Sequence, residues 1–249
     1  MTYIILIAAT MITSIISGVL SMAGGMILMG VFGFLLSVPA AMVLHGVAQA
    51  FSNGSRVWLH RRHIRWSVLL PYTLGALVVL AIFSLTAFVP DIWLVFILIG
   101  SFPVMGLALP RSIDLDMQKK PVAFLSGVMV TTAQMLAGAS GPVLDIFYVK
   151  SSLTRHEILG TKAVTQTLGH IIKLVYYSFL LAVISEEIPA CVFPLVAVAA
   201  LLGNWIGKQL LERISDNQFK TVGHYVILVI GFIYIGKGMY ELIFRQASM

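Results

Sequence analysis

The chain has 249 residues, of which 59% are apolar and only 10% are Asp, Glu, Lys or Arg. Soluble domains average roughly 45–50% apolar and about 25% charged residues, so this chain cannot cover a water-soluble surface. A soluble enzyme and a free-standing binding module are therefore excluded. The first charged side chain is Arg56, after fifty-five residues without Asp, Glu, Lys or Arg. This composition predicts an all-α, polytopic membrane protein.

The remaining charge and cysteine content narrows the function classes further. The formal net charge of +6 comes from a few clusters between apolar runs, which is typical of cytoplasmic loops rather than of a nucleic-acid-binding surface. Cys191 is the single cysteine, so the chain has no internal disulfide. No zinc-protease, nucleophile-elbow, nucleotide-binding or paired-cysteine motif is present. We expect no enzyme activity, no cofactor, no metal and no nucleic-acid partner.

The order of apolar runs predicts two repeats. A membrane helix needs about 20 mostly apolar residues, and eight runs fit: 3–22, 40–59, 66–89, 91–109, 121–138, 156–184, 188–211 and 219–244. Two shorter runs, 26–38 and 142–150, each follow a glycine-bearing break, Ala23-Gly24-Gly25 and Gly138-Ala139-Ser140-Gly141-Pro142. Such short segments at matching places in two halves are typical of transporter binding sites. One integral membrane domain is expected, with a first repeat over 1–110, a cytoplasmic linker over 111–120 and a second repeat over 121–249.

Basic residues predict the orientation of these repeats, because Lys and Arg concentrate in cytoplasmic loops. The basic loops are 56–65, Arg111–Lys120, Lys150 to Arg155, and Arg213–Lys220. All of them face the cytoplasm only if 3–38 and 121–150 each leave and return to one side. The N-terminus, Pro90-Asp91 and Glu186-Glu187 then lie outside, and the two halves are inverted. Residues 142–150 would rise only about 13 Å as a helix against a hydrocarbon core of about 30 Å, which favours re-entrant hairpins over full crossings.

Two predicted helices carry matching polar stripes. His45, Gln49, Asn53 and Arg56 in the first half match Lys162, Gln166, His170 and Lys173 in the second after a shift of 117 residues. Both sets run i, i+4, i+8, i+11, which places each along one face of a helix. Only four of the forty aligned positions in 21–60 and 138–177 are identical. The polar register, and not residue identity, therefore supports the repeat.

The glycine motifs carry a family resemblance. The run Ser17-Gly18-Val19-Leu20-Ser21-Met22-Ala23-Gly24-Gly25, then Pro39-Ala40, a polar helix and a basic loop, resembles the sulfite exporter TauE/SafE family. The run from Ser126-Gly127-Val128 to Gly138-Ala139-Ser140-Gly141-Pro142 resembles that family's second glycine motif. In layout the resemblance covers nearly the whole chain, and it implies eight spans in two repeats that move sulfite, organosulfonates and related small anions. The chain departs from the family in having Ala23 where members often have a third glycine, and no proline between Met26 and Val38.

The glycine breaks are the first candidates for anion binding. If helices begin at these breaks, their unpaired N–H groups and positive dipole ends face the bound solute. A missing Cβ also lets the backbone approach an oxyanion closely. The candidate residues are Gly24, Gly25, Gly138, Ser140 and Gly141. The alternative is that these glycines only allow tight turns or close helix packing, as we expect for Gly203 and Gly207 in the run 188–211.

The polar stripes are the second set of candidates. Amide and imidazole N–H groups of His45, Gln49, Asn53, Gln166 and His170 are suited to donate to sulfite or sulfonate oxygens. Lys162 would supply a fixed positive charge in the membrane, where ionisable residues are functional candidates by default. The alternative is hydrogen bonding between helices. Arg56 and Lys173 are expected near helix ends or snorkelling, rather than as ligands.

Proton coupling has three candidate residues. Asp145 lies inside an apolar run and is either a proton carrier or the counter-ion of Lys162 or Lys173; the ion pair is the favoured reading. His45 and His170 also qualify, because unperturbed histidine titrates near pH 6.5.

A secondary transporter best fits these features. We expect a small sulfur-containing anion, such as sulfite or an organosulfonate, to bind between the two glycine-rich hairpins during alternating access, with export as the direction that the family name implies. The expected location is a bacterial inner membrane, and the expected partners are the anion, the lipid bilayer and a coupled proton or counter-ion. The alternatives are an anion channel, an uptake carrier for another small organic anion and a membrane scaffold without a substrate.

Overall fold

Helices make up the regular structure of the described part of the chain, which confirms the all-α prediction. The computed structural model describes residues 1–20, 23–108, 115–149, 151–181, 187–211 and 216–247, with the side chains at 19–20, 106–108, 211, 216–224 and 245–247 left out. Arg111, Lys150, Glu186 and Arg213, which entered the orientation prediction, lie outside the described residues.

The helix bounds follow the predicted runs with two differences. The helices are α1 (Thr2–Leu20), α2 (Ala23–Leu35), α3 (Val38–His60), α4 (Trp66–Thr86), α5 (Ile92–Ala108), α6 (Lys120–Ala137), α7 (Gly141–Ile146), α8 (Arg155–Leu174), α9 (Val192–Leu211) and α10 (Asp216–Ala247), with the 3₁₀-helix η1 (Arg61–His63) and the π-helix η2 (Val175–Leu180). The first short arm begins at Ala23 and not at residue 26, so Gly24 and Gly25 lie in the first turn of α2. The second short arm contains only the six residues of α7.

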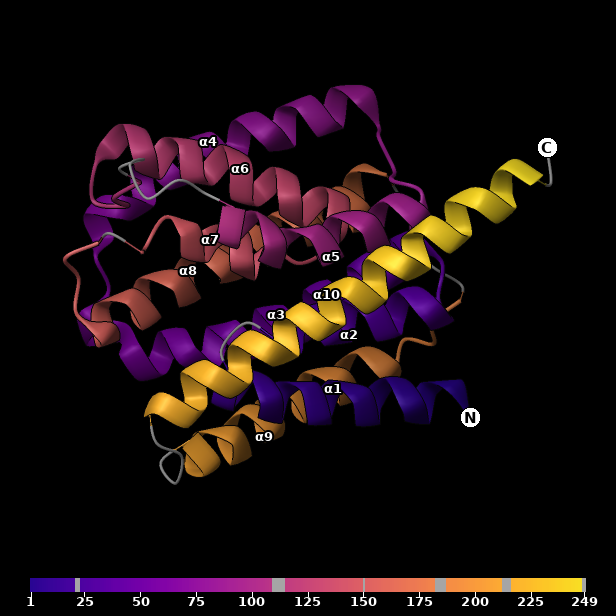
Figure 1. Cartoon of the computed structure of the whole chain (residues 1–249), viewed down its shortest axis with the longest axis horizontal. Helices are drawn as coiled ribbons and strands as arrows, with labels where there is room; N and C mark the ends of the chain where they lie inside the picture. Colours follow the sequence, from indigo (N-terminus) through magenta and orange to yellow (C-terminus); the bar gives the residue numbers. More distant parts are fainter. Residues whose placement is uncertain (21–22, 109–114, 150, 182–186, 212–215, 248–249) are drawn as a thin grey trace.

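The helices form pairs around a central pair (Figure 1). α3 and α8 pack against each other in the centre, α1 packs along α9 at one edge, and α4 packs along α6 at the opposite edge. α10 crosses the face of the molecule and packs along α5. The short helices α2 and α7 lie inside this arrangement, where α2 contacts α1, α3 and α5, and α7 contacts α5 and α6.

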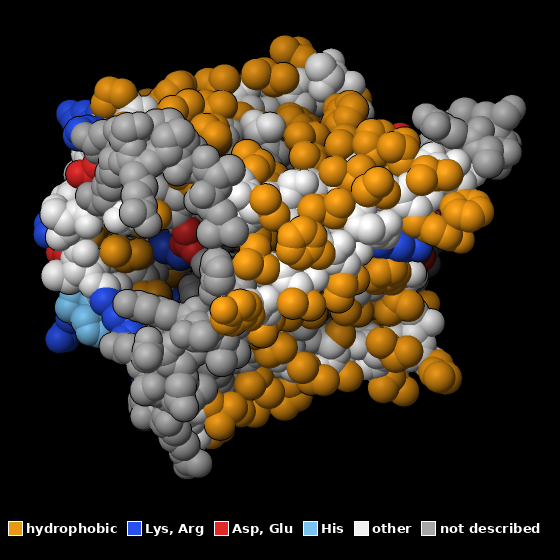
Figure 2. Space-filling view, in the orientation of Figure 1, with side chains coloured by type: hydrophobic (Ala, Val, Ile, Leu, Met, Phe, Trp, Pro, Cys, Tyr) orange, Lys and Arg blue, Asp and Glu red, His pale blue; other side chains and the backbone are white. Residues whose placement is uncertain are grey.

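The outer helices present an apolar surface. Trp66–Thr86 of α4, Val192–Leu210 of α9 and Tyr225–Phe244 of α10 are each long and apolar enough to cross a membrane. Shorter apolar helices cover Thr2–Gly18, Ala23–Leu35 and Ile92–Met105. In Figure 2, hydrophobic side chains are spread over the upper and right-hand parts of the face. The polar stripes, by contrast, lie on the central helices α3 and α8, whose buried residues include His45, Gln49 and His170.

Charged loops gather at two ends of the bundle. At one end, which we call the basic end, the Arg65 guanidinium lies 2.5 Å from the Glu157 carboxylate, and the Arg65 backbone N–H donates to Thr161 Oγ1 at 3.0 Å. Lys, Arg and His side chains gather at this end in Figure 2. At the other end, which holds the N-terminus, the backbone N–H and the hydroxyl of Ser37 donate to the Glu187 carboxylate at 3.0 and 2.7 Å. The loop before α4 therefore lies beside the start of α8, and the junction of α2 and α3 lies beside Glu187.

Close backbone contact explains the glycines of α9. A Cβ on Gly207 would lie 2.5 Å from the Ile15 carbonyl oxygen and 2.9 Å from the Gly18 Cα. A Cβ on Gly203 would lie 2.5 Å from the Met11 carbonyl oxygen. These glycines let the backbones of α1 and α9 touch, as the packing prediction required.

We expect Gly207→Ala to destabilise the protein, because the added methyl group has no room against α1. Overpacking of this kind costs about 1–3 kcal/mol, which a lower thermal unfolding temperature in detergent would report. Gly236→Ala in α10 is the matched control, because a Cβ there meets nothing within 4 Å. Equal unfolding temperatures for the two variants would contradict the close contact of α1 and α9.

Candidate functional site

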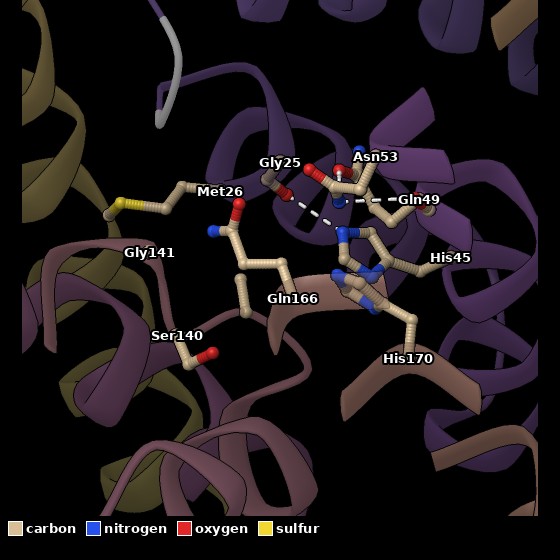
Figure 3. A pocket seen from close by; sticks show the side chains of 10 residues that line it. Gly25, Met26, His45, Gln49, Asn53, Ser140, Gly141, Gln166 and His170 are labelled. Carbon is tan, nitrogen blue, oxygen red and sulfur yellow. Dashed lines mark hydrogen bonds between the residues drawn. The ribbon is translucent and has the colours of Figure 1, made fainter. Parts of the chain in front are cut away.

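A small cavity lies where α2 and α7 begin, beside the middle of α3 and the second half of α8 (Figure 3). The empty space inside it is about 310 Å³, a volume that includes space open to solvent. The lining residues are Gly25, Met26, His45, Gln49, Asn53, Ala139, Ser140, Gly141, Gln166 and His170. Five of these ten residues come from the predicted first repeat and five from the second.

His45 links the two halves through its ring nitrogens. Its Nδ1 lies 2.9 Å from the Lys173 ammonium, and its Nε2 lies 2.9 Å from the Gly25 carbonyl oxygen. An ammonium group can only donate, so Nδ1 accepts and Nε2 carries the proton that goes to Gly25. Lys173 also donates to the Gly138 carbonyl oxygen at 2.9 Å. The N–H of His45 is therefore engaged by the backbone, and we assign it no free donor for a ligand.

Two other predicted residues also use their donors within the protein. The Asn53 amide donates to the Gln49 carbonyl oxygen at 3.0 Å, and the Ser140 hydroxyl donates to Gln134 Oε1 at 2.7 Å. Gln134 on α6 was not singled out from the sequence, since a lone glutamine in an apolar run gives no pattern. Its contact with Ser140 holds the second break against α6.

Three lining residues keep polar groups for a ligand. Gln49 Nε2 and His170 Nδ1 are buried with no hydrogen-bond partner among the described residues. The Gln166 amide extends between the α2 and α7 side of the cavity and the two histidine rings in Figure 3. Buried polar groups are nearly always paired, because an unpaired one costs free energy. Unpaired amide and imidazole groups around one cavity therefore point to a polar ligand.

Lys162 and Asp145 form an ion pair outside the cavity lining. Their side chains are 9% and 25% exposed, and neither residue lines the cavity. Each lies four residues from a lining residue, since Lys162 precedes Gln166 on α8 and Asp145 follows Gly141 on α7. Lys162 and Lys173 were the two expected partners of Asp145, and in the structure Asp145 pairs with Lys162. The ammonium expected at the ligand is thus one helical turn away and already neutralised.

Lys173 lies in the last turn of α8, near a helix end as expected, but its side chain does not snorkel. Its side chain is fully buried, because the chain continues beyond α8 as η2 to Leu180. Arg56, the matching residue of the first stripe, is half-buried, and its guanidinium lies 3.5 Å from Ser52 Oγ. It does not line the cavity.

The glycines of the two breaks divide into packing and lining positions. A Cβ on Gly24 would collide with Thr13 and Ser17 of α1. Gly138 ends α6 at a φ of 74°, a conformation that favours glycine, and a Cβ there would collide with Met29. Gly25 and Gly141, by contrast, line the cavity. Close packing and a tight turn therefore explain why Gly24 and Gly138 are glycines. Gly25 and Gly141, in contrast, bring the backbone to the cavity.

The start of α2 adds backbone donors. The first residues of a helix have N–H groups without intrahelical partners, and the positive end of the helix dipole lies there. α2 spans 13 residues, and its first turn contributes Gly25 and Met26 to the lining. α7 has only six residues, so its helix dipole is small. Its main contribution is to place its first residues at the cavity. Among the described residues, no group of three His, Cys, Asp or Glu side chains could hold a metal ion.

A capping box fixes the start of α8 at the basic end. The Thr154 backbone N–H and hydroxyl donate to the Glu157 carboxylate at 2.8 and 2.9 Å. These hydrogen bonds, and then the charge of Arg65, lower the pKa of the Glu157 carboxyl. A lowered carboxyl pKa stabilises the fold above the ordinary pKa of the group, and this contribution is lost as the pH falls through the lowered value.

One comparison with known proteins gives a match. The family model described as sulfite exporter TauE/SafE matches residues 6–234, a range that contains every lining residue of the cavity. Searches of curated proteins and of solved structures give no match.

The unpaired amide of Gln49 generates a stability prediction. We expect Gln49→Leu to leave the thermal unfolding temperature of the ligand-free protein unchanged or higher, because it removes a buried group without a partner. Ser140→Ala is the contrasting variant, since it leaves Gln134 Oε1 unpaired and should cost about 1–3 kcal/mol. A large loss of stability in Gln49→Leu would show that its amide serves the fold rather than a ligand.

Proposed function

The chain belongs to the sulfite exporter TauE/SafE family, membrane transporters of sulfite or related anions, and we propose that it exports a small sulfur-containing anion by alternating access. The observation that carries this proposal is the cavity between the two glycine breaks. Both halves line it equally, its unpaired amide and imidazole groups are suited to donate to oxyanions, and no carboxylate is among its lining residues.

The anion would be held by side chains of both central helices. Gln49 on α3 and Gln166 and His170 on α8 are the proposed ligands, because Gln49 Nε2 and His170 Nδ1 have no partner among the described residues and Gln166 lines the same cavity. The backbone N–H groups at the start of α2 would complete the site, as at other helix N-termini that bind anions. Gly25 and Gly141 would let the backbone approach the oxygen atoms without a Cβ between them.

Equivalent packing supports two inverted repeats. Under the predicted repeat, α1 to α5 correspond to α6 to α10. α1 then packs on α9 as α6 packs on α4, whereas α3 packs on its own counterpart α8 and α5 on α10. Gly18 on α1 and Gly127 on α6, each within a Ser-Gly-Val triplet, lie against the backbone of the opposite repeat at matching crossings. We propose 1–110 and 121–249 as the repeats, with re-entrant hairpins α1–α2 and α6–α7.

Alternating access requires contacts at each end that open in turn. At the N-terminal end, Glu187 holds Ser37 between α2 and α3. The Lys162–Asp145 pair joins α8 to α7 on the side of the cavity towards the basic end. We expect this ion pair to separate when the cavity opens to the cytoplasm. An inside-negative membrane potential drives an anion outward by about 2.3 kcal/mol per charge per 100 mV. Export therefore needs no coupled ion, whereas uptake would need coupled protons or a counter-ion.

Sulfite counterflow in proteoliposomes tests this function. We expect unlabelled sulfite inside the vesicles to stimulate uptake of labelled sulfite, and Gln166→Leu and His170→Leu to reduce that uptake about tenfold or more, because each removes a hydrogen bond to a charged ligand. Gln118→Leu is the matched control, since Gln118 contacts Ser152 at the basic end. Uptake without counterflow would favour a channel, and no uptake of any sulfur anion would contradict the proposal.

Cysteine labelling tests the orientation. The native Cys191 is exposed and lies four residues after Glu187, at the N-terminal end. In spheroplasts, a membrane-impermeant maleimide should label this cysteine from outside. It should not label Arg62→Cys made in a Cys191→Ser background until the membrane is opened. The reverse pattern would overturn the placement of the basic end in the cytoplasm.

A further inference from the structure

A chain of hydrogen bonds joins the two glycine breaks through Lys173. The Gly25 carbonyl oxygen accepts from His45, His45 accepts from the Lys173 ammonium, and the same ammonium donates to the Gly138 carbonyl oxygen. His45 belongs to the first half of the chain and Lys173 to the second. One ammonium group therefore fixes the position of both breaks relative to each other.

The charge of Lys173 has no counter-ion in the described part of the chain. Its two partners, His45 and the Gly138 carbonyl, are neutral. The carboxylate of Asp145 on α7 is paired with Lys162. The other described carboxylates lie at the ends of the bundle or in α10, at Asp91, Asp116, Glu157, Glu187 and Glu241. A fully buried ammonium in a membrane protein is costly unless an opposite charge comes close.

The cavity is the place where that opposite charge fits. His45 and Ala139, which follows Gly138, both line it, so one layer of neutral groups separates Lys173 from a bound solute. We propose that Lys173 is the positioning residue that makes this cavity select anions over neutral solutes of the same shape, a role that rests on the anion function proposed above. Lys173 supplies the charge and holds the two breaks, while Gln49, Gln166 and His170 contact the anion.

This assignment separates the two buried lysines of α8. Lys162 is paired with Asp145 and adds no net charge, whereas the proposal gives Lys173, which contacts His45, one positive charge beside the cavity. At a separation of one side-chain layer, a unit charge in a protein interior changes the affinity for an anion by about tenfold or more. Selectivity for charge, rather than stability, is therefore the property that Lys173 should control.

Two solutes of matched shape test the proposal. Methanesulfonate is an anion, and dimethyl sulfone is its neutral counterpart with a methyl group in place of one oxygen. Their affinities for the full-length protein in nanodiscs follow from the shift of the unfolding temperature with ligand concentration. Wild type, Lys173→Arg and Lys237→Met should all prefer methanesulfonate. Lys237 is the matched control, because its ammonium pairs with Glu241 on α10.

Lys173→Met should lower the ratio of methanesulfonate to dimethyl sulfone affinity by about tenfold or more. If this variant does not fold, His45→Glu retains Lys173 and neutralises it with a carboxylate, and the same fall in the ratio is expected. A ratio that is unchanged in a folded Lys173→Met or His45→Glu protein overturns the role of Lys173, even if both affinities fall together. A wild type that binds neither methanesulfonate nor sulfite overturns the proposed function, and this inference with it.

Discussion

Lipid offers no hydrogen-bond partner, so every polar group inside a membrane protein must find one within the protein or in a ligand. This constraint explains why α3 and α8, the helices that carry the polar stripes, pack against each other while apolar helices surround them. It also explains the chain from Gly25 through His45 and Lys173 to Gly138, in which each donor meets an acceptor. Among the buried polar groups without a partner, Gln49 Nε2 and His170 Nδ1 belong to residues that line one cavity, and a ligand there would complete their hydrogen bonding.

Each half of the chain supplies what the other lacks. The first half brings the first turn of α2 and the amide of Gln49. The second half brings His170, Gln166 and the buried charge of Lys173. A site divided between the two proposed repeats would be suited to alternating access, because relative motion of the repeats would expose it to either side without dismantling either set of ligands.

Helical spacing in the sequence predicted much of this site. The steps from His45 to Gln49 and from Gln166 to His170 placed these residues on one face of each helix, and in the structure all four line one cavity. Periodicity does not say which residue a side chain meets on another helix. The contact of Lys173 with His45 spans 128 residues of sequence, and neither it nor the role of Gln134 could be predicted. Composition and charge patterning, in contrast, were sufficient for the all-α class.

The anomalous scattering of selenite, the selenium counterpart of sulfite, gives the most direct test of the central claim. In crystals of the full-length protein soaked with selenite, the account predicts a peak within hydrogen-bond distance of Gln49 Nε2 and His170 Nδ1, between Gly25 and Gly141. Lys173 should lie behind His45 without touching the anion. A peak bound directly to Lys162, or peaks found only at the basic end while this cavity holds none, would contradict the account.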